Sequence, residues 1–138
     1  MNGSKNNICL ALLAFRDGGK VMLNRRADAD IEAWEFIGGG VEAGETPFDA
    51  VRREIFEEVN YTLSPDDDLQ FVGDYDFEYD ETRAKVYFFT AKSPGIDKFS
   101  DSEEVFVCDL KFYDAADALD LTLLPLTRKL LEHEDITV

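Results

Sequence analysis

The chain has 138 residues, enough for one domain that buries roughly two thirds of the surface its unfolded form would expose. Its hydrophobic content of 45% supports an ordinary packed core, and no apolar run approaches the roughly 18 residues that a membrane helix needs. The 14 basic and 30 acidic residues give a formal net charge of −16, which disfavours nucleic acid polymers and anionic membranes as partners. A small phosphorylated ligand stays compatible with this charge, because a bound cation can reverse the field within one pocket.

The N-terminal residues 1–7 contain no apolar stretch of the signal-peptide kind. Only Cys9 and Cys108 are available for a disulfide, and each lies in an apolar run. We therefore predict a cytoplasmic protein with one domain over residues 1–138 and two reduced, buried thiols.

The first third of the chain predicts strands joined by glycine turns. The continuous apolar run Ile8–Phe15 predicts a strand buried on both faces. Residues 17–19, Asp-Gly-Gly, and the apolar residues 21–23 then predict a hairpin. After a polar loop, residues 34–37 predict a short strand that runs into three consecutive glycines, 38–40.

A helix over Pro47–Val59 is predicted by signals at both of its ends. Thr46 is suited to the N-cap, Pro47 to the first helical position, and Asp49 to a weaker form of the capping box. Asn60 follows the last turn, and asparagine is the commonest substitute for glycine in a left-handed terminating position.

This helix has two distinct faces. At about 100° per residue, one apolar stripe is predicted to pack on the core; it consists of Phe48, Val51, Ile55 and Val59. Beside it, Glu54, Glu57 and Glu58 fall within an arc of about 100° that we expect to face a cleft.

The second half of the chain predicts more strands and then short helices. The runs 69–79 and 84–91 predict an antiparallel pair around a polar turn at 80–83, followed by a loop over 92–102. Residues 105–107 and 110–113 predict one strand or two short ones, Asp114 could cap a helix through Leu119, and Pro125 could begin a last helix through Glu132. This order predicts an α+β fold with a mixed sheet covered by helices.

The three glutamates are the strongest chemical signal in the chain. Carboxylates at i, i+3 and i+4 repel one another, so a divalent cation would justify their proximity. Two plain alternatives stay open at this point. The glutamates could form a solvated helix face with ordinary ion pairs, and the glycines at 38–40 could form only a tight turn.

Residues 39–61 fit the pattern G-x5-E-x7-R-E-U-x-E-E-x-G-U, where U is a bulky aliphatic residue, and so resemble the signature of the Nudix hydrolases. The matching residues are Gly39, Glu45, Arg53, Glu54, Ile55, Glu57 and Glu58. Asn60 replaces the glycine of the pattern and Tyr61 its final aliphatic residue. Neither departure falls on a metal ligand implied by the resemblance.

The preceding segment, LNRRADADIEAWEFIGG, resembles the MutT-type branch of the family, which removes oxidised nucleoside triphosphates. That branch usually has proline where this chain has Ile37, and lysine or arginine where it has Gly40. The missing cation weakens contact with phosphate, so these departures bear on the choice of substrate.

The resemblance implies a Nudix-like α/β/α sandwich with a mixed β-sheet and a catalytic loop-helix. It also implies a Mg²⁺ site, in which Mn²⁺ is a substitute, with Glu54, Glu57, Glu58 and the backbone carbonyl of Gly38 as ligands. Arg53 would hold a glutamate in place by a charge-assisted hydrogen bond. Glu45 would brace the loop or reach the metal through water.

Family members often use a further acid from a loop after the central sheet, as base or additional ligand. Glu103 and Glu104 are the candidates, although adjacent loop acids are also typical of plain solvated charge. Glu78, Asp80 and Glu81 compete for the same role. The only histidine, His133, lies among charges and is predicted to be a surface residue.

Substrate contacts are expected from the segment before the glycines and from Gly39. Arg26 ends a strand that leads to the site and could contact phosphate. Phe36 could stack on a nucleobase or belong to the core, and Trp34 could share either role.

The function predicted from these residues is Mg²⁺-dependent pyrophosphohydrolysis of nucleoside diphosphate-linked substrates, with oxidised or normal nucleoside triphosphates first. ADP-ribose, a nucleotide sugar or a dinucleoside polyphosphate is the alternative substrate. A nucleotide-sensing domain without catalysis is the alternative from another class. The expected partner is a small nucleotide, and the resemblance leaves a homodimer open.

Overall fold

Strand β1 (Asn6–Asp17) is the centre of a mixed sheet in the computed structural model, which describes residues 6–26, 33–79, 81–100, 107–123 and 125–132. It pairs in parallel with β6 (Thr82–Lys92) along nearly its whole length and antiparallel with β4 (Ile37–Gly40). Its residues 11–15 are all buried. The prediction of a strand buried on both faces is therefore confirmed for this central part only, because Ile8 is 37% exposed and Cys9 is half-buried, which contradicts the predicted burial of the Cys9 thiol.

The predicted hairpin joins β1 to β2 (Lys20–Arg26) through two glycines. Asp17 pairs with Lys20, so the turn consists of Gly18 and Gly19, whose φ angles are 59° and 82°. Two successive positive φ angles suit the right-handed twist of the flanking strands, and glycine adopts them without a steric penalty.

The expectation of one strand over residues 34–37 is wrong. Strand β3 (Trp34–Glu35) pairs with β2, whereas β4 pairs with β1, and Phe36 lies between the two. The chain changes partner here because β2 stays beside β1 only at the hairpin, where the register pairs Arg16 with Val21. Strands β5 (Gln70–Tyr79) and β7 (Val107–Asp114) complete the sheet, on β6 and β2 respectively.

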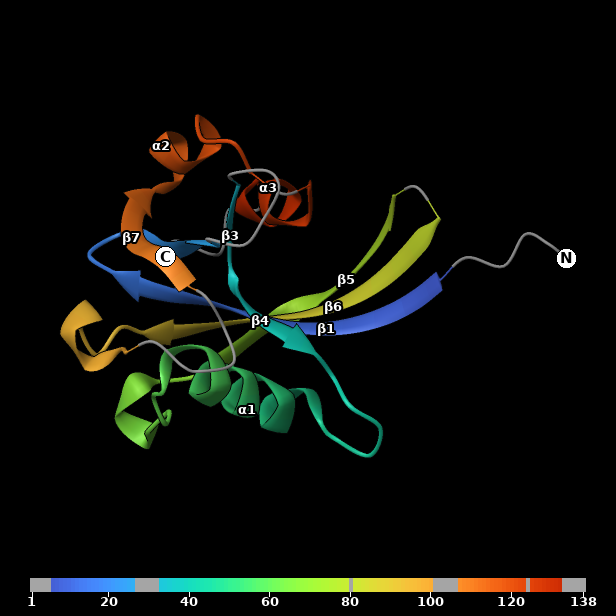
Figure 1. The fold of residues 1–138 in the computed structure, drawn as a ribbon, viewed down its shortest axis with the longest axis horizontal. Coiled ribbons are helices and arrows are strands. Elements are labelled where there is room, and N and C mark those ends of the chain that lie inside the picture. Colours follow the sequence, from blue (N-terminus) through green and yellow to red (C-terminus); the bar gives the residue numbers. More distant parts are fainter. Residues whose placement is uncertain (1–5, 27–32, 80, 101–106, 124, 133–138) are drawn as a thin grey trace, which may run out of the picture.

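Helices cover both faces of this sheet, as Figure 1 shows. Helix α1 (Pro47–Val59) lies on one face, and α2 (Ala115–Leu119) and α3 (Pro125–Leu131) lie on the other. Two short 3₁₀ helices, η1 (Pro65–Asp67) and η2 (Ile96–Lys98), occupy connections. The predicted α/β/α sandwich is confirmed. In the described ranges, no helix has the length and apolar character to cross a membrane.

Several boundaries in the second half differ from expectation. Strand β6 begins at Thr82, which pairs with Tyr79, so the turn is shorter than the predicted 80–83. Residues 107–114 form one strand, and the predicted loop over 92–102 contains η2. Asp114 precedes α2, but its side chain makes no capping hydrogen bond. Pairing with β5 extends β6 to Thr82, and pairing with β2 extends β7 to Asp114, in both cases beyond the apolar run.

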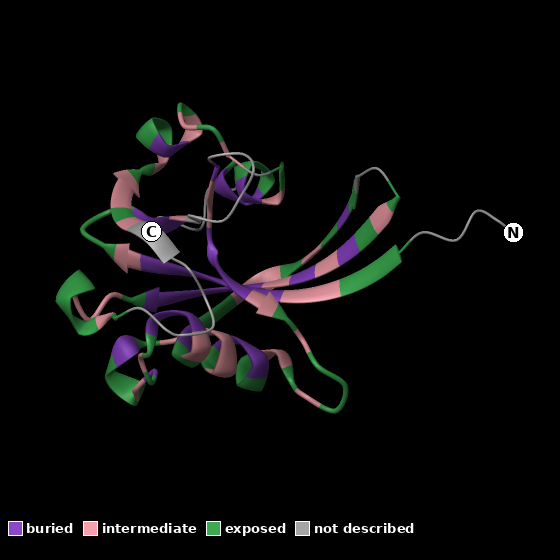
Figure 2. Cartoon of the chain, in the orientation of Figure 1, coloured by how far each residue is buried: buried purple, intermediate pink, exposed green. Residues whose placement is uncertain are grey.

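The packing face of α1 is close to the prediction. Val51, Ile55 and Val59 are buried against the sheet, but Phe48 is 44% exposed. Its ring meets Phe89 edge-on, with centroids 4.8 Å apart, near the N-terminus of the helix. The small residue Ala50 is buried in its place, and Figure 2 shows the buried side of α1 turned toward the sheet.

The two departures from the family signature both make specific contacts. Asn60 adopts the left-handed conformation (φ 54°, ψ 41°) in which glycine would end the helix, so this prediction is confirmed. The ring of Tyr61 packs against Phe99, with centroids 5.4 Å apart, and its hydroxyl donates to Asp67 at 2.7 Å. Tyrosine thus supplies the apolar body of an aliphatic residue and adds a hydrogen bond.

Replacing Tyr61 by phenylalanine should lower the free energy of unfolding by about 1–2 kcal/mol, because the buried Asp67 loses a donor. Burial and then the hydrogen bond to Asp67 raise the pKa of Tyr61 to about 12 in the folded protein. A raised pKa stabilises the fold below the ordinary tyrosine pKa of about 10, and this contribution is lost as the pH rises toward 12. Urea unfolding at pH 7 and across pH 9–12 would show both effects. An unchanged alkaline transition in Tyr61→Phe would contradict the second.

Candidate active site

Helix α1 is held at both ends, which sets the direction of its acidic side chains. At the start, the amide of Asp49 donates to the Thr46 hydroxyl at 3.1 Å, and Pro47 occupies the first turn. At the end, the amide of Asn60 donates to the Phe56 carbonyl at 2.9 Å. The predicted helix bounds are confirmed at both termini.

Two of the glycines in β4 are required for different reasons. Gly38 has φ 137°, and a Cβ there would lie 2.2 Å from the carbonyl oxygen of Ala11. A Cβ on Gly39 would instead lie 2.6 Å from the carboxylate of Glu54. Gly38 therefore lets the strand approach β1, and Gly39 makes room for a functional side chain. The reading of these glycines as only a tight turn does not fit, because Gly38 and Gly39 are paired strand residues.

Glu58 ties the helix to this strand. It is only 3% exposed, and its Oε2 accepts a hydrogen bond from the Gly38 amide at 2.9 Å. The helical pattern predicted that Glu58 faces a cleft with the other acids, and this is wrong. Strand β4 lies over that part of the helix, so Glu58 is buried with its carboxylate directed at the backbone.

Arg53 connects the other acids in a single network. Its Nε and Nη2 donate to the two oxygens of Glu45 at 2.7 and 3.0 Å, and Nη2 also donates to the Gly40 carbonyl at 2.8 Å. Its Nη1 lies 3.0 Å from Oε1 of Glu54 and 3.0 Å from Oε1 of Glu57. The solvated helix face does not describe Glu54 and Glu58, because the side chain of Glu54 is 17% exposed and Glu58 is buried, whereas Glu57 is 30% exposed and forms an ion pair with Arg53.

Glu45 lies at the loop end of this network. Besides both contacts from Arg53, its Oε1 accepts a hydrogen bond from the amide of Glu42 at 2.9 Å. These hydrogen bonds, that from Arg53 first, lower the pKa of Glu45 to about 2. A lowered pKa means that its contribution to stability is present above the ordinary pKa and is lost only as the pH falls toward 2. The loop is therefore braced at neutral pH.

The pKa of Glu54 is shifted in the opposite direction to that of Glu45. Burial raises its pKa, although the neighbouring Arg53 acts to lower it. The arginine thus does not fully offset the loss of water around this carboxylate. A further positive charge close to Glu54 would stabilise its ionised form.

The donor chemistry of these residues fits a hard divalent cation, since Mg²⁺ prefers carboxylate and carbonyl oxygens. Glu54, Glu57 and Glu58 lie within two turns of one helix, and burial raises the pKa of Glu54 although Arg53 lies beside it. Across the described ranges, however, no three acidic, histidine or cysteine side chains already converge as a metal site.

Several predicted site residues lie away from this network or outside the described residues. Glu103, Glu104, Asp80 and His133 are in the latter group. The backbone of Arg26 pairs with Val107 next to a bulge, but its side chain is also outside the described part. Glu78 accepts from Arg83 at 2.9 Å, and Glu81 is exposed beside it, so neither is brought to the network.

Phe36 belongs to the core on the opposite face of the sheet. It is 1% exposed, and its ring packs 5.0 Å from that of Phe88. The expectation of an open stacking platform is therefore not supported, and the core alternative is. Trp34 packs beside the same core, edge-on to Tyr113 with centroids 5.3 Å apart.

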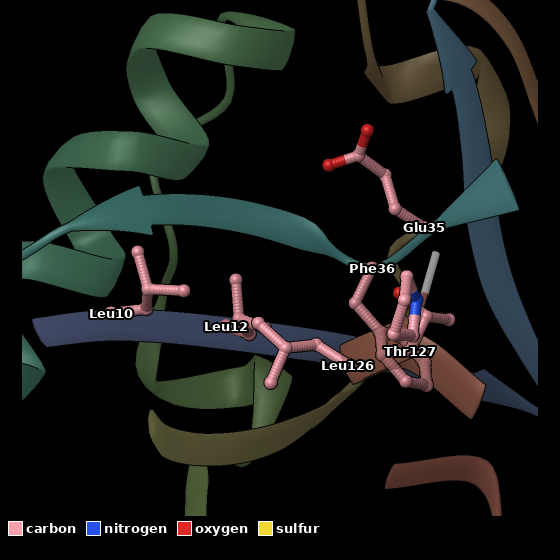
Figure 3. A pocket seen from close by; sticks show the side chains of 7 residues that line it. Leu10, Leu12, Glu35, Phe36, Leu126 and Thr127 are labelled. Atoms are coloured by element: carbon pink, nitrogen blue, oxygen red, sulfur yellow. The ribbon is translucent and has the colours of Figure 1, made fainter. Parts of the chain in front are cut away.

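Phe36 also lines an apolar pocket of about 270 Å³ that was not predicted. Figure 3 shows Leu10 and Leu12 on one side of it and Leu126 and Thr127 on the other. The complete lining is Leu10, Leu12, Glu35, Phe36, Pro125, Leu126 and Thr127. These residues come from three distant segments, so no local pattern in the sequence could have indicated the pocket.

The pocket and the acidic network share strand β4. Gly40 and Gly38 pair with Leu10 and Leu12, which line the pocket, whereas Gly39 pairs with Ala11 and lies against Glu54. Paired residues in neighbouring strands project to the same face of a sheet. Adjacent residues of one strand therefore border the pocket on one face and the carboxylates on the other.

Part of the chain is similar in sequence to known RNA pyrophosphohydrolases. A segment of 66 residues is 44% identical to an RNA pyrophosphohydrolase from Halorhodospira halophila, covering 48% of this chain and 33% of that protein. A second RNA pyrophosphohydrolase, from Bartonella clarridgeiae, is 40% identical over 57 residues, 36% of this chain and 33% of the relative. The matches thus span about one third of the length of these curated relatives.

Solved structures resemble the whole fold. The MutT NUDIX hydrolase from Burkholderia pseudomallei has a TM-score of 0.77 at 22% identity, covering 94% of this chain and 99% of that one. The E. coli dihydroneopterin triphosphate pyrophosphohydrolase has a TM-score of 0.69 at 25% identity, covering 93% and 94%. The NUDIX domain family matches residues 6–133 of the chain. The chain therefore belongs to the Nudix hydrolase family.

Proposed function

We propose that the protein is a divalent-cation-dependent hydrolase that cleaves a phosphoanhydride bond in a nucleoside diphosphate-linked substrate, with nucleoside triphosphates first. One observation carries this proposal. Two glutamates of α1 lie against the glycine strand, Glu54 beside Gly39 and Glu58 on the Gly38 amide, and Arg53 joins Glu54 to a third, Glu57.

Glu54, Glu57 and Glu58 would hold the cation, with the Gly38 carbonyl as a further ligand. When bound, Mg²⁺ or Mn²⁺ neutralises charge on the phosphate oxygens and lowers the pKa of an attacking water. The protein keeps the ligands in position: Glu58 is fixed by the Gly38 amide, and the loop before the helix is fixed by Glu45 and Arg53. Glu103 or Glu104 is proposed as the base, and Arg26 as a phosphate contact.

The apolar pocket is proposed to hold the nucleoside part of the substrate. Its lining is mostly aliphatic and aromatic, and pockets of a few hundred Å³ with such walls suit a planar organic group. The pocket borders β4 on the face opposite to α1, so a nucleotide bound there would extend past the edge of this strand to bring its phosphates to the acids.

The named relatives, both RNA pyrophosphohydrolases, support a second candidate, pyrophosphohydrolysis of RNA. The formal net charge of −16 works against it, because attraction to the phosphate backbone supplies much of the affinity for a nucleic acid polymer. We therefore favour a small nucleotide. ADP-ribose, a nucleotide sugar and a dinucleoside polyphosphate stay as alternative substrates.

A substrate panel with Mg²⁺ tests the proposal. It contains the natural and oxidised nucleoside triphosphates, ADP-ribose, a nucleotide sugar, a dinucleoside polyphosphate and a 5′-triphosphorylated RNA oligomer. We expect at least one nucleoside triphosphate to exceed the other classes by about tenfold in kcat/KM, because that class combines a nucleoside for the pocket with a free polyphosphate end and lacks the polymer backbone charge of the RNA. Inorganic tripolyphosphate is the control, and it should be a poor substrate if the pocket binds the nucleoside.

Each other outcome of the panel has a definite meaning. Preference for ADP-ribose, a nucleotide sugar, a dinucleoside polyphosphate or RNA would overturn the choice of substrate and keep the chemistry. Tight nucleotide binding without hydrolysis in either cation would overturn the enzymatic proposal and support a sensing domain.

A further inference from the structure

Both departures from the family signature contact the same short segment. The side-chain amide of Asn60 donates to the Ser100 hydroxyl at 3.1 Å, and the ring of Tyr61 packs edge-on against Phe99. The backbone amide of Ser100 also donates to the Val59 carbonyl at 2.9 Å. Two consecutive residues at the end of α1 therefore hold two consecutive residues, 99 and 100, that follow η2.

The side chain of Asn60 is not needed to end α1. Its φ of 54° lies in the left-handed region, which glycine adopts at lower cost than asparagine. Glycine at this position, as in the family pattern, has no group that could reach Ser100. The carboxamide of Asn60 thus adds a contact that the pattern residue could not make.

The segment 99–100 is held by three different kinds of contact. The ring of Phe99 lies 5.1 Å from that of Phe15, which is fully buried in β1, and 5.4 Å from that of Tyr61. The backbone amide of Ser100 binds the end of α1, and its hydroxyl binds Asn60. Together these contacts attach the segment to the core and to the helix that carries the acids.

This segment leads directly into the connection that carries the proposed base. Glu103 and Glu104 follow Ser100 by three and four residues and lie outside the described residues. A chain extends by at most about 3.6 Å per residue, so the Cα of Glu103 lies within about 11 Å of that of Ser100. The position of Ser100 therefore limits where either acid can act.

Both ends of this connection are attached next to proposed site residues. At its start, Ser100 binds the carbonyl of Val59, the residue after the proposed ligand Glu58. At its end, Val107 begins β7 and pairs with Arg26, the proposed phosphate contact. An acid between these two points is thus brought to the end of α1 where the ligands lie.

We infer that Asn60 is a positioning residue for the catalytic base and acts through its hydrogen bond to Ser100. It fixes the point at which the connection leaves α1, and so limits the distance of the base from the cation ligands. Tyr61 and Phe99 give the same segment its apolar support. The inference rests on the proposed function, which assigns the base to Glu103 or Glu104.

Asn60→Gly removes the hydrogen bond and keeps the end of the helix. It should lower kcat about tenfold and change KM by less than about twofold, because the contact positions the base and not the nucleoside. Its unfolding temperature should stay within about 2 °C of the wild type, since glycine ends a helix in the same conformation. Steady-state kinetics with the best nucleotide of the panel, and thermal unfolding, measure these effects.

Substitutions at Ser100 test the same hydrogen bond from its other side. Ser100→Ala should lower kcat as much as Asn60→Gly does, and it also serves if the glycine variant does not fold. Ser100→Thr keeps the hydroxyl and should regain most of the lost kcat.

A double-mutant cycle separates positioning of the base from a general effect on α1. The second background carries Glu103→Gln together with Glu104→Gln, which removes the proposed base. In that background Asn60→Gly should lower kcat by less than about twofold, because there is no base left to position. A general effect on the helix would instead lower kcat by the same factor in both backgrounds.

Asp68→Gly is the matched control. Asp68 also has a positive φ, 51°, and its side chain accepts an exposed hydrogen bond from Gln70 at 2.9 Å. Replacement by glycine therefore makes the same change of backbone and removes a comparable hydrogen bond, but at the end of η1. Its kcat should stay within about twofold of the wild type.

The possible failures have different meanings. An equal loss of kcat in both backgrounds, or wild-type kcat in Asn60→Gly and Ser100→Ala, would overturn the inference and leave the proposed function intact. Wild-type kcat in the variant that lacks both loop glutamates would overturn the inference and the choice of base, while the hydrolase proposal stands. A wild-type protein that hydrolyses no member of the panel would overturn the inference and the proposed function together.

Discussion

Replacing Glu57 by glutamine is expected to lower kcat by at least about 1000-fold while the protein stays folded. The carboxylate is one of the proposed cation ligands, and a lost ligand removes several kcal/mol of charge stabilisation from the transition state. The substitution keeps the shape of the side chain, and Glu57 is 30% exposed, so the fold does not depend on it. Steady-state hydrolysis of the best nucleotide from the panel, together with circular dichroism and thermal unfolding, measures both parts.

Asp49→Asn is the control for this substitution. It removes one negative charge from an exposed position in the first turn of the same helix. Its kcat should stay within about twofold of the wild type, because no proposed ligand is touched. Glu58→Gln is also expected to abolish turnover, but with some loss of stability, since Glu58 is buried on the Gly38 amide. Wild-type turnover in both glutamine variants would refute the assigned site.

Alanine at Gly39 and at Gly38 should have opposite consequences. In Gly39→Ala, the new Cβ would lie 2.6 Å from the Glu54 carboxylate, which is the movable end of a side chain. The protein should fold with its unfolding temperature within a few degrees of the wild type. The displaced carboxylate should lower kcat about 100-fold, because a ligand shifted by about 1 Å no longer holds the productive geometry.

Gly38→Ala should instead destabilise the folded protein strongly. Its Cβ would lie 2.2 Å from a carbonyl oxygen of β1, at a φ of 137° that side chains rarely adopt. Neither the backbone of a central strand nor this conformation relaxes at low cost, so we expect at least about 3 kcal/mol of destabilisation. The free energy of unfolding in urea and kcat should be measured for both alanine variants. An active, stable Gly38→Ala protein, or a Gly39→Ala protein that loses stability and not kcat, would contradict the two roles.

Much of the site could be predicted from the sequence because its determinants are local. The bounds of α1 depend on Thr46, Pro47 and Asn60, whose preferences act within one turn of the helix. The spacing of Glu54, Glu57 and Arg53 then follows from 3.6 residues per turn. The Gly18–Gly19 turn is equally local, since two positive φ angles need little beyond the glycines themselves.

The sequence by itself therefore determined the family, the loop-helix and the identity of the acidic residues. The tertiary structure alone decided that Glu58 is buried, that Phe36 lies in the core, and that Gly38 and Gly39 serve different neighbours. It also decided that Leu10 and Leu126 meet at one pocket. These features arise where β4 leaves the path of β3 and pairs with β1. Contacts between segments far apart in the chain depend on packing, and no local preference of a residue specifies its distant neighbour.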